Sequence, residues 1–284
     1  MNEDAFHERG SAPREHGGAA GGAALDAFPA GAGPAEAAGA RAFIAAQCMA
    51  AVGSIDAEGA VWVSLLFGKP GFLRTSDGGA IRIDMPPKER DLADPVWENM
   101  AVGADLGLLF VDYAARRRYR INGTVQRLDR RGTEVLAHEA GPGRPGYIPW
   151  RMLRELGEPR LPVQTAHGAQ VRGAVERIVR CADTLFVACR QAAHGAAVTH
   201  RGGDPGFVTV AGPTTLRLPD DPGNGLCGND RLEGRAGICI PDFDNGQVLQ
   251  LTGHVRSGGA GRHWDFEVSH WVLRDMPRAV TLER

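Results

Sequence analysis

The stretch VWVSLLFGKPGFL at residues 61–73 decides the fold, because the chain repeats it as AAVTHRGGDPGFV at residues 196–208. The two stretches align without a gap, with Ser64 above Thr199, a shift of 135 residues. A Gly-x-Pro-Gly-Phe pattern recurs in both of them. A repeat at this spacing indicates two like modules in one chain.

A second pair of stretches extends the repeat. GLLFVDY at residues 107–113 aligns with GICIPDF at 237–243, and INGTV at 121–125 aligns with LTGHV at 251–255, both at a shift of 130 residues. The shift changes by only five residues between the two matching blocks, so one insertion or deletion region separates them. Positions where the two copies differ are therefore the best places to look for function.

Composition excludes several classes of protein. The chain has 284 residues, which is enough for two modest domains, and 43% hydrophobic with 23% charged residues is typical of a globular protein. The net charge of −2 gives no general field toward nucleic acid or membrane surfaces, so we expect neither as a partner. No apolar run approaches the roughly 20 residues that a membrane-spanning helix needs.

The cysteines and the N-terminus point to a reducing compartment. The five cysteines are odd in number and none has C-x-x-C spacing. The N-terminus has no basic start followed by an apolar segment, so we expect no secretory signal, reduced thiols and a cytoplasmic location. The nine histidines are scattered without ligand spacing, and no metal site is expected.

Composition and the pattern of short strands and turns along the chain indicate four expected segments. Residues 1–34, rich in Ala, Gly and Pro, are expected to be disordered or loosely packed. Residues 35–137 form a first module, 138–182 a connector with a helix near 167–180, and 183–284 a second module. Each module has about six short strands and one helix between the fourth and fifth. The prediction is a mainly β fold with a few helices, of the α+β class, in which each module is a β-barrel.

The repeated strand itself contains the clearest functional difference. The second copy has Thr199, His200 and Arg201 followed by Gly202, where the first copy has Ser64, Leu65 and Leu66. An arginine can bind a phosphate with two hydrogen bonds, and glycine allows the backbone to approach a ligand. The alternative interpretations are a solvated strand arginine and a histidine that packs in the core or caps a turn.

Several short segments together resemble one family. THRGGDPGF at 199–207, LPD at 218–220, PGN at 222–224 and LQLTG at 249–253 resemble the FMN-binding split-barrel proteins related to pyridoxamine 5′-phosphate oxidase, and in particular their tandem branch. SLLFGKPGF at 64–72 and RRRYRING at 116–123 are similar to the first half of that branch. The resemblance implies two fused FMN-binding split barrels, related by internal duplication, with FMN as the cofactor.

The resemblance also implies a set of cofactor-binding residues. The loop after residue 218 would run beside the phosphate and ribityl chain, Gln250 would approach the flavin ring, and its duplicate Arg120 would neutralise a phosphate or a charged substrate. The expected ring position is the groove between the modules. Leu65 and Leu66 would leave the matching second groove without a phosphate anchor. The candidate cofactor-binding residues are Thr199, His200, Arg201, Gly202, Asp220, Gly223, Asn224, Gln250 and Arg120.

These observations predict a flavoprotein that transfers electrons between a reduced donor and a small molecule or oxygen. No catalytic residue is assigned, and the Arg–Ser–His substrate triad of pyridoxamine-phosphate oxidase is not found, so that specific activity is not expected. The fused modules would act as a monomeric pseudo-dimer or as a homodimer, and a separate reductase is a further partner class. The alternative is a non-enzymatic protein that binds or senses flavin or haem. Two segments favour it, GYI at 146–148 and CGN at 227–229, because each resembles a shortened form of a longer segment of the tandem branch.

Overall fold

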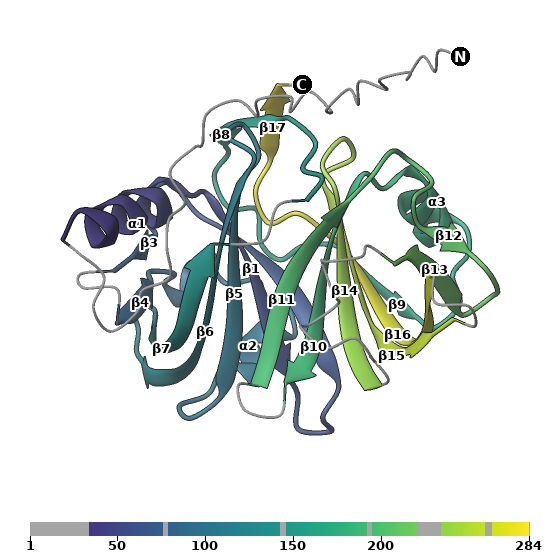
Figure 1. Cartoon of the computed structure of the whole chain (residues 1–284), viewed down its shortest axis with the longest axis horizontal. Helices are drawn as coiled ribbons and strands as arrows, with labels where there is room; N and C mark the ends of the chain where they lie inside the picture. Colours follow the sequence, from purple (N-terminus) through teal and green to yellow (C-terminus); the bar gives the residue numbers. More distant parts are fainter. Residues whose placement is uncertain are drawn as a thin grey trace, which may run out of the picture.

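The computed structural model describes residues 34–75, 79–142, 146–191, 195–220, 234–258 and 263–283. Two expectations lie outside these residues: the N-terminal disorder, and the helix between the fourth and fifth strands of the second module, which the sequence places near residues 229–233. The fold is mainly β with a few short helices, as predicted from the sequence (Figure 1). No helix among the described residues is long and apolar enough to cross a membrane.

The first module begins with a helix and forms one antiparallel sheet of seven strands, in the order β2-β1-β5-β6-β7-β4-β3. Two short helical turns, η1 and α2, replace the single helix expected between the fourth and fifth strands. β7 continues to Pro142, past the residue at which the sequence places the end of this module. The elements are α1 (Pro34–Ala46), β1 (Met49–Ile55), β2 (Val61–Phe67), β3 (Leu73–Arg74), β4 (Ala80–Ile83), η1 (Pro87–Glu89), α2 (Val96–Asn99), β5 (Asp105–Asp112), β6 (Arg117–Leu128) and β7 (Thr133–Pro142).

The second module repeats this order strand for strand, as β11-β10-β14-β15-β16-β13-β12, and β9 adds to β16. The helix expected near 167–180 is shorter, because residues 165–168 form β9. A separate two-stranded sheet joins β8 to the C-terminal β17. The elements are β8 (Met152–Leu156), β9 (Thr165–Gly168), α3 (Ala174–Cys181), β10 (Thr184–Gln191), β11 (Gly195–Gly202), β12 (Thr209–Val210), β13 (Thr215–Pro219), β14 (Gly234–Asp242), β15 (Gln247–Ser257), β16 (His263–Asp275) and β17 (Val280–Glu283).

The strand registers show that the duplication is structural. Ser64 pairs with Val52, Val52 with Leu108, and Leu108 with Ile121. The second sheet contains the same row at the repeated positions, which are Thr199, Val187, Ile238 and Leu251. The prediction that Ser64 and Thr199 occupy equivalent strand positions is therefore confirmed.

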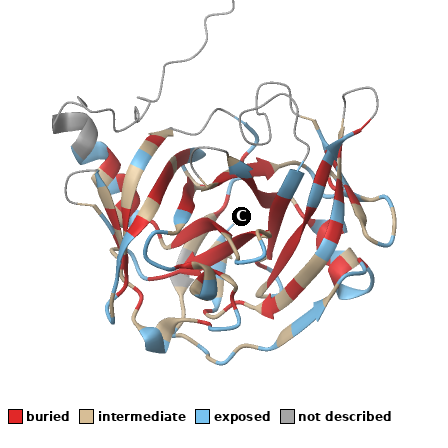
Figure 2. Ribbon diagram, turned by 90° about the horizontal axis from the view of Figure 1, so that it is seen from below, coloured by how far each residue is buried: buried red, intermediate tan, exposed pale blue. Residues whose placement is uncertain are grey.

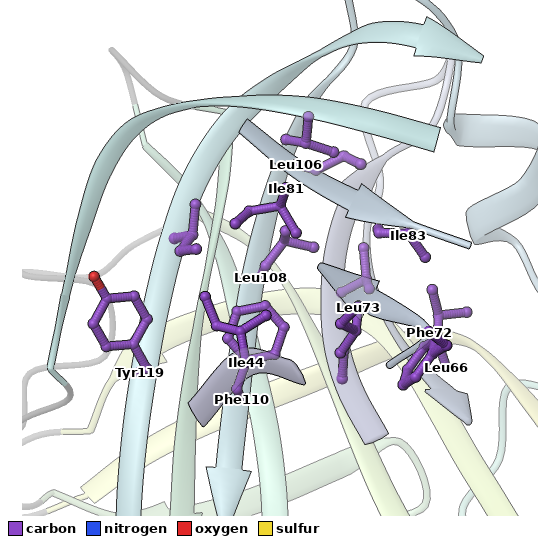
Figure 3. Close-up of a cluster of buried hydrophobic side chains, with 14 of the residues drawn as sticks. Ile44, Leu66, Phe72, Leu73, Ile81, Ile83, Leu106, Leu108, Phe110 and Tyr119 are labelled. Carbon is purple, nitrogen blue, oxygen red and sulfur yellow. The ribbon is translucent and has the colours of Figure 1, made fainter. Parts of the chain in front are cut away.

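Each sheet encloses its own hydrophobic core. In the first module every strand contributes to one buried cluster, which includes Leu66, Leu73 and Ile81 and to which α1 adds Ile44 (Figure 3). The second module has a matching cluster around Val187, Ile238 and Leu251. Because all the strands of the first sheet face one cluster, the sheet must curl around it.

A third buried cluster joins the modules. It combines residues of β1, β2 and β5 with residues of β10, β11 and β14, and β8 and β17 pack against it from one end (Figures 1 and 2). A Cβ atom added at Gly107 would lie 2.0 Å from the carbonyl oxygen of Ala196, and one added at Gly237 would lie 2.5 Å from that of Val61. These two contacts are the same contact in the two repeats, so the modules meet around an approximate two-fold axis.

One expectation about the cysteines is wrong. Cys189 on β10 is disulfide-bonded, whereas Cys48, Cys181 and Cys239 are free thiols. The sequence pattern could not show this, because none of the cysteines has a spacing that marks a pair.

Candidate functional site

The strand β11 holds the residues that distinguish the two repeats. It is the edge strand of the second sheet, and alternate side chains point to opposite faces. His200 faces the first module, and Arg201 points the other way, where its Nη1 donates to the carbonyl oxygen of Pro219 at 3.3 Å. Both side chains are buried. Thr199 is partly buried, and its hydroxyl is 3.5 Å from the carbonyl oxygen of Val187.

His200 lies in a buried aromatic and cationic environment. Its ring is 6.0 Å from that of Tyr113 and 5.5 Å from that of Phe186, both in edge-to-face geometry. Arg118, on β6 of the first module, donates to the backbone oxygen of His200 at 2.9 Å. Burial first, and then the positive charges of Arg118 and Arg151, hold the pKa of His200 well below its usual value. The imidazole is therefore neutral at physiological pH and can donate one hydrogen bond and accept another.

The segment between the modules covers this junction. Arg151 is 3% exposed, lies 5.0 Å above the ring of Tyr113, and forms an ion pair with Asp183 at 2.5 Å. Tyr147 packs against Gly202 so closely that a Cβ atom there would lie 2.9 Å from the tyrosine ring. Sequence reasoning did not single out Tyr113 or Arg151.

Four buried polar atoms around β11 have no hydrogen-bond partner among the described residues. They are Tyr113 OH, His200 Nε2, Arg151 Nε and Thr184 Oγ1. Burial raises the pKa of Tyr113, so its hydroxyl keeps its proton and can donate. Because buried polar groups in native proteins are nearly always satisfied, this concentration indicates a polar partner such as a ligand or ordered water. We call these residues, with Arg118 and Arg201, the β11 junction.

Two further predicted residues lie near this junction. Asp220 directly follows Pro219, whose carbonyl receives the hydrogen bond from Arg201, and the Asp220 carboxylate accepts from the indole of Trp264 at 2.9 Å. Arg120 alternates with Arg118 on β6 and pairs with Glu139 at 2.6 Å. Gly223 and Asn224 lie outside the described residues.

Gln250 does not lie with the other candidates. It shares one row of the sheet with His200, through Phe186 and Cys239, so two strands stand between them. Three strand spacings separate the two residues by about 14 Å. Gln250 is fully buried, and its amide nitrogen donates to Val63 O at 2.8 Å and to Ser64 Oγ at 3.0 Å. It therefore belongs to the opposite junction, where β15 meets β2.

That opposite junction is closed by a network of buried charges. Arg274 donates to Gln250 Oε1 at 2.9 Å, and its guanidinium pairs with Asp94 at 2.6 Å and also with Asp91. Ser64 donates to Asp94 as well. We call this set the Arg274 network; each of these side chains is buried and bonded to another member.

The two junctions have thus diverged from a common plan. The positions of Arg118, His200 and Arg201 are Val248, Leu65 and Leu66 in the other repeat. One junction satisfies its own polar groups, and the other contains cationic groups and unsatisfied polar atoms. The donors of the β11 junction fit the phosphate and polar edges of FMN, because guanidinium, hydroxyl and imidazole N–H groups all bind such acceptors.

Comparison with known proteins does not identify the chain. No family model matches it, and no curated protein matches it significantly. A solved structure described as the K. pneumonia MrkH–c-di-GMP complex is similar over 78% of each chain, with 8% identity and a TM-score of 0.22. A likeness at this level carries no argument about fold or ligand.

Proposed function

We propose that this protein is an FMN-binding flavoprotein of the split-barrel type, related to pyridoxamine 5′-phosphate oxidase, with one cofactor site at the β11 junction. The observation that carries the proposal is the divergence of the two junctions. A cationic, partly unsatisfied set of side chains stands where the matching junction has valine and leucine.

The residues would divide the cofactor between them. Because His200 and Arg201 point to opposite faces of the edge strand β11, the cofactor would have to span this edge, with Arg201 and the backbone of Gly202 holding the phosphate. Arg118, on the first module, and the neutral His200 would face the remainder of the molecule. Tyr147 would cover it from the connector. When bound, the flavin would supply two-electron transfer between a reduced donor and a small molecule or oxygen, and the protein would bind and orient it.

Flavin titration of the purified protein tests this proposal. We expect a yellow protein with flavin absorbance. If the protein is purified without the cofactor, we expect it to quench the fluorescence of added FMN until one equivalent per chain is bound. Arg201→Leu and Arg118→Val, which introduce the residues of the other repeat, should each weaken binding by about ten- to a hundredfold, the range for losing a charged hydrogen bond. Arg180→Leu, at an exposed arginine of α3, is the matched control.

Two outcomes would count against the proposal. Wild-type affinity in both junction variants, with far-ultraviolet circular dichroism showing that they are folded, would remove the β11 junction as the site. Tight FMN binding without reduction by any nicotinamide donor or reoxidation by oxygen would favour the non-enzymatic alternative.

A further inference from the structure

A basic hollow lies on the outer end of the first module, at a site distinct from the β11 junction. It has a volume of about 660 Å³ and is bordered by β3, β4, β7 and the turn between β6 and β7. This volume is in the range of pockets that bind small molecules. Its arginines are Arg74, Arg82, Arg127, Arg130 and Arg131.

Two of the three carboxylates of the hollow form ion pairs with these arginines. Arg82 bonds to Asp84 at 3.1 Å and to Asp129 at 2.8 Å, and Arg74 and Arg127 add ion pairs to the same two acids. Five arginines stand against three acids, the third being Glu134, so the hollow has a net charge of +2. Among the described residues, the guanidinium groups of Arg130 and Arg131 have no ion-pair partner.

The turn that presents Arg130 and Arg131 is held firmly. The Asp129 carboxylate accepts from the backbone nitrogens of Arg131 at 2.7 Å and Gly132 at 3.0 Å. These bonds and the ion pair with Arg82 hold the pKa of Asp129 well below its usual range. A Cβ atom at Gly132 would lie 1.9 Å from the oxygen of Ile83, so the turn is pressed against β4. The two arginines therefore extend from a fixed backbone.

The fold of the repeat does not require these arginines. The position of Arg74 is Thr209 in the second module, and Arg82 corresponds to Arg217, which forms an ion pair with Asp265. The sequence that follows β15 is Gly-Gly-Ala-Gly-Arg at 258–262, whereas the sequence that follows β6 is Asp-Arg-Arg-Gly at 129–132. Both modules keep the same strand order, so this order does not depend on the additional arginines.

We infer that this hollow binds a small molecule with two or more linked phosphoryl groups, such as inorganic triphosphate or a nucleoside triphosphate. Planar guanidinium groups bind phosphoryl oxygens with paired hydrogen bonds, and several arginines around one hollow suit several such groups. These arginines border one hollow that is open to solvent, and a site of this size favours a small molecule over a long nucleic-acid strand.

Calorimetric titration of the full chain with inorganic triphosphate tests the inference. We expect binding that weakens steeply with added salt, and at least a tenfold loss of affinity in Arg130→Gln/Arg131→Gln. Arg217→Gln, at the matching position of Arg82, should bind triphosphate as the wild type does. Arg201→Leu should also bind normally, which separates this site from the proposed FMN site.

Three results would overturn the inference: no heat with triphosphate or ATP at low salt, an equal loss of affinity in Arg217→Gln, or binding of single-stranded RNA or an acidic peptide without binding of triphosphate. FMN titration of the double variant completes the test. Unchanged FMN affinity together with lost triphosphate affinity supports two independent sites, and loss of both would show that triphosphate reports on the β11 junction.

Discussion

Tyr113 and Phe243 meet edge to face across the approximate two-fold axis, with ring centroids 6.3 Å apart and planes at 85°. They occupy the same position in the two repeats, 130 residues apart. Arg151 lies over both rings, 5.0 Å from one and 5.2 Å from the other. A single side chain from the connector thus bridges the two hairpins that the duplication placed face to face.

The glycines of the module junction should be intolerant of a methyl group. Gly107→Ala and Gly237→Ala would each place Cβ against a backbone oxygen of the other module, so we expect a loss of about 1–3 kcal/mol in the free energy of unfolding. Urea denaturation measures this. Gly157→Ala, whose nearest neighbour would be 3.4 Å away, is the control, and equal stability of all three variants would contradict the packing.

The Arg274 network should be a strong determinant of stability. Arg274→Ala leaves the Asp91 and Asp94 carboxylates buried without their cation, so we expect a loss of about 3–5 kcal/mol by chemical denaturation. Arg217→Ala breaks an exposed ion pair with Asp265 and should cost about 1 kcal/mol or less. A similar small loss in both variants would show that the network contributes little.

His200 should make stability fall in acid. In the unfolded chain a histidine titrates near about pH 6.5, whereas the folded protein keeps His200 neutral well below that pH. Below about pH 6.5 the unfolded chain therefore binds a proton that the folded chain does not, and stability decreases by up to about 1.4 kcal/mol per pH unit.

Denaturation of the apoprotein at several pH values tests this dependence. His200→Leu, which introduces the residue of the other repeat, should lose less stability than the wild type between about pH 6.5 and about pH 5. Arg180→Leu, at an exposed arginine of α3, changes no histidine and is the control. An unchanged acid slope in His200→Leu would contradict the assignment.

The positions of Leu66 and Arg201 should separate stability from binding. Leu66 is 3% exposed in the first core, so Leu66→Ala should cost about 2–5 kcal/mol through the cavity that it leaves. We expect its FMN affinity to match the wild type at temperatures where it is folded. If Leu66→Ala were as stable as the wild type but bound FMN weakly, the cofactor site would lie in the first module and the proposal would be wrong.

The repeat made much of the architecture predictable. Aligned positions such as Ser64 and Thr199 predict that equivalent strands have equivalent partners in the two modules, because homologous strands keep their hydrogen-bond partners. β7 is not predicted from the sequence: its second half, residues 138–142, reads His-Glu-Ala-Gly-Pro, which lacks the alternation of a half-buried strand and is assigned to the connector.

The candidate site was less predictable. An alignment of the two repeats shows which residues are equivalent across the sheets. It does not show which strand of the other module packs against each of these residues. Gln250 was therefore grouped with Arg201, although β2 encloses it. The ion pair of Arg274 with Asp94 joins residues 180 apart that no motif links. Tyr113 does carry a signal in the sequence, because its duplicate Phe243 lacks the hydroxyl group.

The approximate two-fold axis has a genetic consequence. In a symmetric homodimer one codon specifies the same residue in both subunits, so a substitution that improves one junction also occurs at the other. Fusion of the two copies removes that coupling. One junction is closed around Arg274 and the other contains cationic side chains, so a substitution in one half of the gene leaves the residues of the other half unchanged.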